Sequence, residues 1–307
     1  MSVAKPLRFA VIGRGRMAAT MRGLVGDVPL DLADAVYVAC GNADHVRQSR
    51  LALEASKPVL CEKPLSLQGD EAQALTLLAR ERGLTFMEAV ATPFLPAVSR
   101  AIDIAATGGI GPIRRLEASF GYPVSRRRFP RLFAPDAGVL ADRAVYPLML
   151  ARILLGPVTA MECRVDRDRA GIDVAARLSL VHDGGARSDL SVSFVGTLGN
   201  DLRIEGADAT LELMPPLLTA QRLRLRPADA SGPSRLRAAL RQNPLLRRIG
   251  DVGGRLTGSF HSHGGSIYRH ELEHFADLVR KGCVESPVVT HARMVDVVRL
   301  IEEARQR

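Results

Sequence analysis

Residues 7–18 read Leu7-Arg8-Phe9-Ala10-Val11-Ile12-Gly13-Arg14-Gly15-Arg16-Met17-Ala18, an apolar run followed by a turn with two glycines. An apolar run that stops at Gly13 is typical of a buried parallel strand, and we expect a helix from about Met17. Gly13 permits a tight turn, Gly15 lets the backbone approach a pyrophosphate, and the start of the helix supplies unpaired N–H groups. Ala18 stands in the place of a third glycine. The stretch therefore predicts a strand, a dinucleotide-binding loop and a helix.

The alternation of strands and helices continues to about residue 90. Strand-like runs lie at residues 36–40, 58–61 and 84–90, with helical periodicity between them at 45–56 and 69–82. This alternation predicts βαβ units and a parallel sheet covered on both faces. Only about fifty residues separate the glycine loop from Cys61-Glu62-Lys63-Pro64, fewer than a complete nucleotide-binding sheet needs. We therefore expect a truncated Rossmann-like sheet.

The pattern changes after Pro96. A helix to about residue 107 precedes longer strands at 113–122, 158–166, 175–182, 188–195, 201–205 and 210–213, which a helix at about 139–155 interrupts. We expect a mostly antiparallel sheet with helices on one face. Residues 228–265 are expected to form a long excursion, and 266–281 and 290–305 helices. The predicted fold class is α/β plus α+β, with a shortened dinucleotide-binding domain at 1–96 and a substrate and oligomerisation domain at 97–307.

Composition narrows the classes of function. Of the 307 residues 47% are hydrophobic, and the net charge is +9. The basic residues are spread along the chain and only 4% of residues are aromatic, so we expect no nucleic-acid partner. Without a signal peptide or a run of roughly twenty apolar residues, we expect a cytoplasmic protein and no membrane contact. The four cysteines lie far apart in the sequence, and we expect them to be reduced core residues. His261-Ser262-His263 has no further potential ligands around it, so we expect no metal site.

Lys63 is singled out by the rarity of lysine. The chain has four lysines among 42 basic residues, and arginine fills the other positions. An ammonium group can exchange a proton with a substrate oxygen, whereas a guanidinium remains charged. Lys63 also follows a strand, at the edge where open α/β sheets bind ligands. The alternative is a surface lysine beside Glu62.

Several segments together resemble the Gfo/Idh/MocA oxidoreductases over most of the chain. The most specific of them is Cys61-Glu62-Lys63-Pro64-Leu65. The others are Gly13 to Ala18, Asp34 to Val38, Asn42 with His45, Ala52 to Leu60, Phe86 to Ala89, Phe94 to Pro96, Tyr146 to Leu148, Tyr268 to Phe275, and Ser286-Pro287.

The resemblance implies an NAD(P)-dependent oxidoreductase that acts on CH–OH groups of a sugar, polyol or related small molecule. Lys63 would then lie at the reacting oxygen. The family carries an Asp and a His or Tyr four residues apart, and this spacing puts Asp142 and Tyr146 on one helical face. Tyr146 would be the acid/base, with Lys63 lowering its pKa and Asp142 orienting the pair or the substrate. Tyr146 could instead close a helix on the core.

The cofactor would be NAD or NADP. The residues expected to bind it are Gly13, Gly15, Arg16, Met17, Ala18, Cys40, Asn42, His45, Glu62 and Lys63. Arg14 and Arg16 flank the pyrophosphate position and favour NADP. An acid about twenty residues after the loop usually binds the ribose, and counting nominates Asp31 or Asp34. Arg126-Arg127-Arg128 with Arg131 could receive an anionic substrate or a cofactor phosphate, or could form a solvated loop.

The sequence also departs from the family. The second and third strands of the nucleotide-binding domain are expected to be missing between about Val25 and Leu32. Cys40-Gly41 stands where the family has Thr-Pro, Arg143 where it has glycine, and Pro93 where arginine is frequent. Strand one would then be an edge that needs an oligomer contact or a loop over it, or that leaves the fold marginally stable.

These departures keep other functions open. The chain could be a degenerate, non-redox member that serves binding or oligomerisation, or a lyase or epimerase that uses the same acid/base residues. For the oxidoreductase we expect a homodimer or homotetramer formed through the C-terminal sheet.

Overall fold

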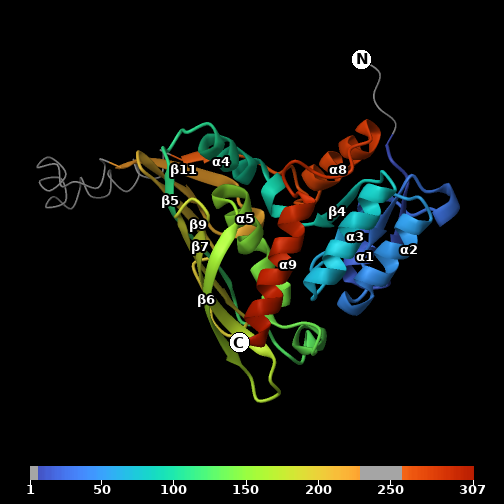
Figure 1. The fold of residues 1–307 in the computed structure, drawn as a ribbon, viewed down its shortest axis with the longest axis horizontal. Helices are drawn as coiled ribbons and strands as arrows, with labels where there is room; N and C mark the ends of the chain where they lie inside the picture. Colours follow the sequence, from blue (N-terminus) through green and yellow to red (C-terminus); the bar gives the residue numbers. More distant parts are fainter. Residues whose placement is uncertain (1–5, 229–257) are drawn as a thin grey trace, which may run out of the picture.

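The fold is built around two sheets that lie side by side (Figure 1), in a computed structural model that describes residues 6–228 and 258–307. The first sheet is wholly parallel and has the order β1-β2-β3-β4. Its strands are β1 (Phe9–Ile12), β2 (Ala35–Val38), β3 (Val59–Glu62) and β4 (Phe86–Ala89), and the helices between them are α1 (Arg16–Val25), α2 (His45–Glu54) and α3 (Gly69–Glu81). The predicted truncated parallel sheet is confirmed.

The second sheet has eight strands in the order β12-β11-β10-β9-β5-β8-β7-β6. Every neighbouring pair is antiparallel except β5 with β8. The strands are β5 (Ile113–Gly121), β6 (Val158–Arg167), β7 (Asp173–His182), β8 (Arg187–Ser193), β9 (Leu202–Gly206), β10 (Ala209–Leu213), β11 (Arg222–Pro227) and β12 (Gly258–Phe260). The remaining α-helices of the described residues are α4 (Pro96–Ala106), α5 (Val145–Leu155), α8 (Arg269–Lys281) and α9 (His291–Gln306). Most of the excursion predicted at 228–265 lies outside the described residues.

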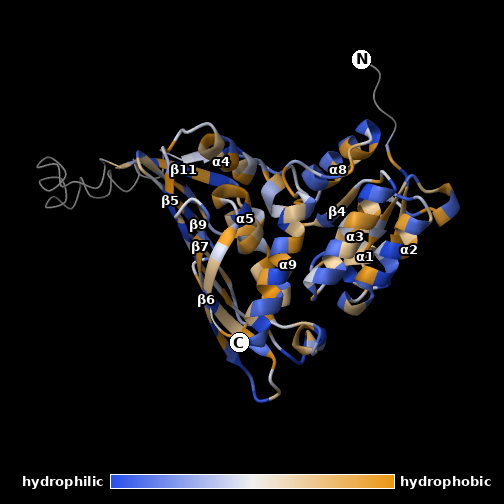
Figure 2. Ribbon diagram, in the orientation of Figure 1, coloured by the Kyte–Doolittle hydropathy of each residue, from blue (hydrophilic) through white to orange (hydrophobic). Residues whose placement is uncertain are grey.

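Side-chain alternation places the helices on one face of the second sheet, as predicted. In β5, Leu116, Ala118 and Phe120 are buried, whereas Arg115 and Glu117 point to the other face. Residues of that outer face form ion pairs such as Arg115 with Asp189, and hydrophilic and hydrophobic residues both occur along the strands of this sheet (Figure 2). The inner face packs against helices that include α4 and α5 (Figure 1).

Strand β1 is an edge strand, and a short segment of the chain covers its open side. Val28 N–H donates to the carbonyl of Phe9 at 2.9 Å, and Val11 N–H donates to Asp27 Oδ1 at 2.9 Å. Arg22 Nη2 donates to the carbonyls of Val11 and Gly13 at 2.9 and 2.8 Å, and Arg22 also pairs with Asp27 at 2.6 Å. The sequence left open an oligomer contact, a loop over this edge, or marginal stability. The structure shows the loop.

The C-terminal helices join the two sheets. Helix α8 lies on the first sheet, where Phe275 packs against Phe9 with ring centroids 6.1 Å apart. Helix α9 packs against both α3 and α5 (Figure 1), and Glu302 accepts a hydrogen bond from Gly69 N–H at 2.8 Å. Residues 266–307, which the sequence-based division assigns to the second domain, thus also cover the first sheet. No helix in the described part of the chain is both long and apolar enough to span a membrane.

Candidate active site

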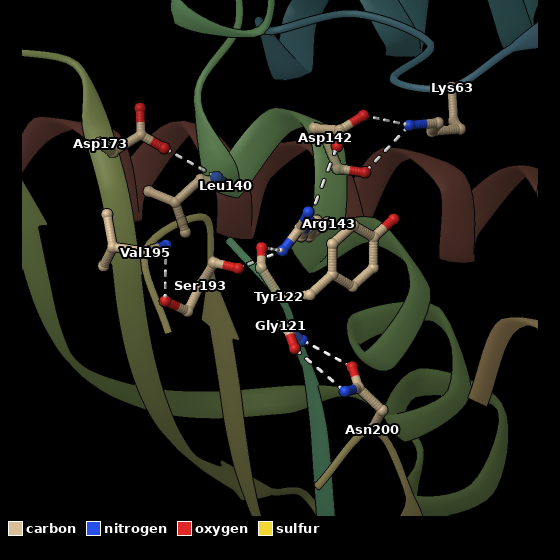
Figure 3. A network of polar contacts seen from close by, with 10 residues as sticks. All are labelled: Lys63, Gly121, Tyr122, Leu140, Asp142, Arg143, Asp173, Ser193, Val195 and Asn200. Atoms are coloured by element: carbon tan, nitrogen blue, oxygen red, sulfur yellow. Dashed lines mark hydrogen bonds and ion pairs between the residues drawn. The ribbon is translucent and has the colours of Figure 1, made fainter. Parts of the chain in front are cut away.

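Lys63 directly follows β3, at the carboxyl end of the strand, and faces the helix layer of the second sheet. Its ammonium nitrogen donates to Asp142 Oδ1 at 2.8 Å and to the backbone carbonyl of Asp142 at 2.9 Å (Figure 3). The side chain of Lys63 is 15% exposed and that of Asp142 is 27% exposed. The two residues are 79 positions apart, so the pair joins the first sheet to the helix layer of the second.

A turn of π-helix presents Asp142. It spans Leu140–Ala144 and leads directly into α5. Its start is fixed from β7, because the carboxylate of Asp173 accepts the N–H of Leu140 at 2.7 Å (Figure 3). A π-helical bond from the Asp142 carbonyl would run to residue 147, but Pro147 has no N–H. The carbonyl of Asp142 accepts a hydrogen bond from Lys63, and turns of this kind are frequent at functional sites.

Tyr146 lies one turn after Asp142 and also meets Lys63. The ammonium nitrogen of Lys63 is 5.2 Å from the centroid of the Tyr146 ring, and Phe120 packs edge-on against that ring. Burial alone would lower the pKa of Lys63, but the charges of Asp142 and Tyr146 raise it above its usual value. Burial raises the pKa of Tyr146, and Lys63 offsets only part of that rise. Lys63 is thus an ammonium and Tyr146 a neutral phenol.

Arg143 is a feature of the site that the sequence marked only as a departure. It is 1% exposed, and its guanidinium carbon lies 5.0, 4.0 and 4.7 Å from the ring centroids of Phe120, Tyr122 and Phe194. The guanidinium donates to the carbonyls of Tyr122 and Ser193 (Figure 3). Its Nε is 3.9 Å from Asp142 Oδ2, so Asp142 lies between two cations.

The two glycines of the loop after β1 differ in their surroundings. Gly13 has φ +139°, and a Cβ added there would collide with the carbonyl of Ala39 in the neighbouring chain segment. A Cβ added at Gly15 would meet nothing within 4 Å, so this side of the loop is open. Ala18 is fully buried and Met17 is partly buried against the core, so these two side chains hold the loop and the start of α1 against the core.

The other residues predicted to bind the cofactor surround the ends of β2 and β3. Asn42 donates to the carbonyl of Asp136 at 2.9 Å, which ties this end of β2 to a loop of the second domain. His45 is buried, and its Nδ1 lies 2.8 Å from the carbonyl of Pro64, so it supports the turn that holds Lys63. Cys40 follows β2 beside Gly13. Glu62 accepts hydrogen bonds from the Tyr37 hydroxyl at 2.7 Å and from Lys63 N–H at 3.2 Å.

Three carboxyl groups lie around this turn, of which those of Glu88 and Glu271 are buried and that of Glu62 is partly buried. Burial raises the pKa of Glu62, and it raises that of Glu88, on β4, to about 7. Burial and the charges of these two residues raise the pKa of Glu271, on α8, well above its usual value. Glu88 Oε2 and Glu271 Oε1 have no hydrogen-bond partner. Sequence reasoning missed Glu88 and Glu271 as site residues, although both lie in segments that resemble the family.

Asp31 and Asp34 do not lie at the glycine loop. Both precede β2 and therefore sit at the amino ends of the strands, whereas the loop follows the carboxyl end of β1. Asp34 pairs with Arg8, just before β1, at 2.8 Å. Asp34 thus flanks a strand and Asp31 lies in a short 3-10 helix before it, which is the alternative to a ribose role; counting residues ignores which end of the sheet the chain has reached.

Comparisons with known proteins agree with this architecture. One family model, described as the oxidoreductase family NAD-binding Rossmann fold, GFO/IDH/MocA, matches residues 24–90, and the GFO/IDH/MocA C-terminal domain model matches residues 98–212. The chain is 26% identical over 275 residues to trans-1,2-dihydrobenzene-1,2-diol dehydrogenase of Bos taurus, which covers 89% of this chain and 77% of the relative. It is 28% identical, with the same coverage, to D-xylose 1-dehydrogenase (NADP(+)) 2 of Haloferax volcanii.

Solved structures share the fold. An aldose-aldose oxidoreductase from Caulobacter crescentus superposes with a TM-score of 0.76 at 19% identity, covering 98% of both chains. A 3-ketoreductase from Actinomadura kijaniata, solved with NADP and TDP-benzene, gives a TM-score of 0.75 at 22% identity and the same coverage.

Proposed function

Because this chain belongs to the Gfo/Idh/MocA family of NAD-binding oxidoreductases, we propose that it transfers a hydride between NAD(P) and a CH–OH or carbonyl carbon of a sugar, polyol or related molecule. In this proposal residues 1–96 bind the dinucleotide and residues 97–307 shape the substrate site. The observation that carries it is the meeting of Lys63, Asp142 and Tyr146 where the first sheet adjoins the helix layer of the second.

The glycine loop supports binding of the cofactor. The open space above Gly15 and the close approach of Gly13 to the end of β2 are the two features that a diphosphate needs from such a loop. Bound there, the cofactor supplies or accepts the hydride. Cys40 and Glu62 lie at neighbouring strand ends, where the nicotinamide half would extend.

The chain's own residues move the proton. In the reducing direction the Tyr146 phenol donates its proton to the substrate carbonyl oxygen as the hydride reaches the carbon, which leaves a phenolate and an alcohol. The Lys63 ammonium stabilises that phenolate, and Asp142 holds Lys63 in place through two hydrogen bonds. In the reverse direction the phenolate removes the hydroxyl proton.

The state of Tyr146 favours reduction at neutral pH. Its raised pKa keeps the phenol protonated, so the acid form is abundant and the base form is scarce. We expect the rate of carbonyl reduction to be flat near neutrality and the rate of alcohol oxidation to increase tenfold per pH unit there.

The relatives guide the choice of substrate class. Their names include a trans-dihydrodiol and xylose. Both of these carry adjacent oxygen functions on a small ring or a sugar chain, so we propose a carbohydrate-like substrate. For the assembly we propose a dimer or tetramer formed through the outer face of the second sheet.

Titration of the purified protein with NADH and NADPH, followed by calorimetry, tests the proposal first. Failure of both to bind below about 1 mM would contradict it and favour a non-redox binding protein. Given binding, Lys63→Met and Tyr146→Phe should keep the cofactor affinity and lower turnover of a panel of aldoses, ketoses and diols by roughly a thousandfold.

A matched control separates chemistry from folding. Lys281→Met removes an exposed lysine at the end of α8 and should keep full turnover. Equal losses in the control and the test variants would contradict the assigned roles.

A further inference from the structure

Arg143 is a buried cation directly beside the residues that move the proton. It follows Asp142 in the π-helical turn and is 1% exposed. Its Nε lies 3.9 Å from Asp142 Oδ2, and this Nε has no hydrogen-bond partner among the described residues. That distance is too long for a hydrogen bond but short enough for electrostatic attraction away from bulk water. The guanidinium therefore acts on the second oxygen of a carboxylate whose first oxygen binds Lys63.

The second sheet holds this guanidinium in place. Arg143 Nη1 donates to the carbonyl of Tyr122, just after β5, at 3.0 Å and to the carbonyl of Ser193, at the end of β8 (Figure 3). Three aromatic rings lie around the guanidinium carbon, with centroids 4.0 to 5.0 Å away. Such rings attract a cation but do not neutralise its charge. Within the described part of the chain, Asp142 has the one carboxylate within ion-pair distance of Arg143.

The strand ends that receive the guanidinium are themselves fixed (Figure 3). Gly121, the last residue of β5, donates its N–H to Asn200 Oδ1 at 2.8 Å, and its carbonyl accepts from Asn200 Nδ2 at 3.0 Å. At the end of β8, Ser193 Oγ accepts the N–H groups of Val195 and Gly196 at 3.1 and 2.9 Å. The guanidinium is thus anchored on a part of the second sheet that has little freedom to move.

The charges around the proton-transfer step show why a second cation matters. The Lys63 ammonium and the Asp142 carboxylate balance each other, with the nitrogen and Oδ1 2.8 Å apart. Glu62, next to Lys63, adds a negative charge when it is ionised. A phenolate at Tyr146 would therefore form where the charge of Lys63 is already matched by that of Asp142, and an unbalanced charge in a partly buried site is costly. Arg143 can offset part of the Asp142 charge through the second oxygen.

We propose that Arg143 is a positioning residue of the reaction, which orients the Asp142 carboxylate and shares its negative charge, so that the charge of Lys63 stabilises the Tyr146 phenolate. The inference rests on the proposed function, because it concerns the proton transfer of that reaction. Arg143 acts through Asp142 and contacts neither substrate nor cofactor. Since the rings and the strand ends hold the guanidinium before the substrate arrives, little reorganisation accompanies the reaction.

Turnover by variants at position 143 tests this role, with the aldose, ketose or diol that the unmodified protein turns over fastest. Arg143→Met should lower kcat about thirtyfold and change KM and the Kd of the cofactor by less than about threefold. Arg143→Lys keeps the charge and should lower kcat only about threefold. A packing role predicts the opposite order, because methionine packs well against aromatic rings whereas lysine would bury a charge with fewer hydrogen bonds. Arg143→Gln is a second neutral variant and should match Arg143→Met.

A double-mutant cycle tests whether Arg143 acts through Asp142. In the Asp142→Asn background, Arg143→Met should lower kcat by less than about threefold, because no carboxylate is left to balance. Arg152→Met is the matched control, since Arg152 is a buried arginine of α5 that pairs with Asp296 on α9. Urea denaturation gives the folded fraction of each variant, and kcat per folded protein should stay within about twofold for this control.

Three results would overturn this role. They are a kcat of Arg143→Met within about threefold of the unmodified protein, a kcat of either neutral variant equal to or above that of Arg143→Lys, and effects that multiply in the double variant. Should Arg143→Met fail to fold, Arg143→Gln replaces it in each comparison. Absence of turnover by the unmodified protein with every member of the panel would instead reject the proposed function, and the role of Arg143 with it.

Discussion

The outer edge of β1 and the carboxyl end of β3 both hold charged side chains, but under opposite conditions. At the β1 edge, Asp27 is half-exposed, and hydrogen bonds from Val11 and Arg22 lower its pKa. Near the end of β3, Glu88 on β4 and Glu271 on α8 are buried, each keeps an oxygen without a partner among the described residues, and their pKa values are raised. The first arrangement stabilises the fold, and the second costs stability.

This difference distinguishes contacts that stabilise an open strand edge from buried groups that serve a function. A strand edge needs only a few donors and acceptors, and residues 22–28 supply them locally. Unpaired buried carboxyl groups beside an ammonium persist only where something other than stability maintains them, and perturbed groups of this kind cluster at functional sites. The contacts at the β1 edge thus serve stability, whereas the buried carboxyl groups near the end of β3 mark a candidate functional site.

The largest effect is expected at the end of β3. Asp142→Asn keeps the shape of the side chain but removes the anion that Lys63 binds, so we expect turnover to decrease by about a hundredfold. The pKa of Lys63 should decrease, because burial then acts without the opposing charge of Asp142. The pH profile of turnover reports this shift. Asp103→Asn, on the exposed side of α4, is the control, and a flat response to Asp142→Asn would show that Asp142 does not hold the active form of Lys63.

The edge of β1 should respond in stability instead of turnover. Asp27→Ala leaves Val11 N–H unpaired and frees Arg22, so we expect a loss of about 1–3 kcal/mol in the free energy of unfolding. Because the folded pKa of Asp27 lies below its unfolded value, its contribution is present above the unfolded pKa and is lost as the pH falls through the folded pKa.

Urea denaturation at pH 7 and at pH 3 measures both effects, and the difference between the variant and the original chain should shrink at the lower pH. Turnover of the folded Asp27→Ala variant should stay within about twofold. A large loss of turnover with unchanged stability would mean that the edge takes part in catalysis, and would remove the distinction between the two regions.

The opposite sign is expected for Glu88. Its folded pKa of about 7 lies above the unfolded value of 4.5, so ionisation opposes folding increasingly between these two values and fully above pH 7. Glu88→Gln can keep the bond from Leu65 N–H, and we expect it to stabilise the protein by about 1–2 kcal/mol at pH 8 and by almost nothing at pH 4.5. Thermal unfolding at the two pH values measures this, and equal stabilisation at both would show that charge is not the cause.

Local patterns predicted the first sheet, since alternating strands and helices and the short interval before Lys63 fix both its order and its edge. They could not predict the hydrogen bonds and the ion pair with which residues 22–28 cover that edge. Arg22 and Asp27 look like ordinary surface residues until β1 lies beside them. Arg143 was equally hidden, because its aromatic neighbours come from β5 and from the end of β8, about 20 to 50 residues away. Contacts of this range leave no periodic signal in the sequence.

The same reasoning applies to counting residues to an acid, and it gives the smallest expected effect. Asp31 lies in the short 3-10 helix Leu30–Leu32 at the amino ends of the strands, far from any ligand that the glycine loop could hold. Asp31→Ala should therefore change the affinities for NADH and NADPH by less than about twofold, whereas a true ribose-binding acid would cost tenfold or more. A tenfold loss on Asp31→Ala would mean that the cofactor runs around the β1 edge to the other end of the sheet. The β1 edge would then take part in recognising the cofactor, and its contacts could not be assigned to stability alone.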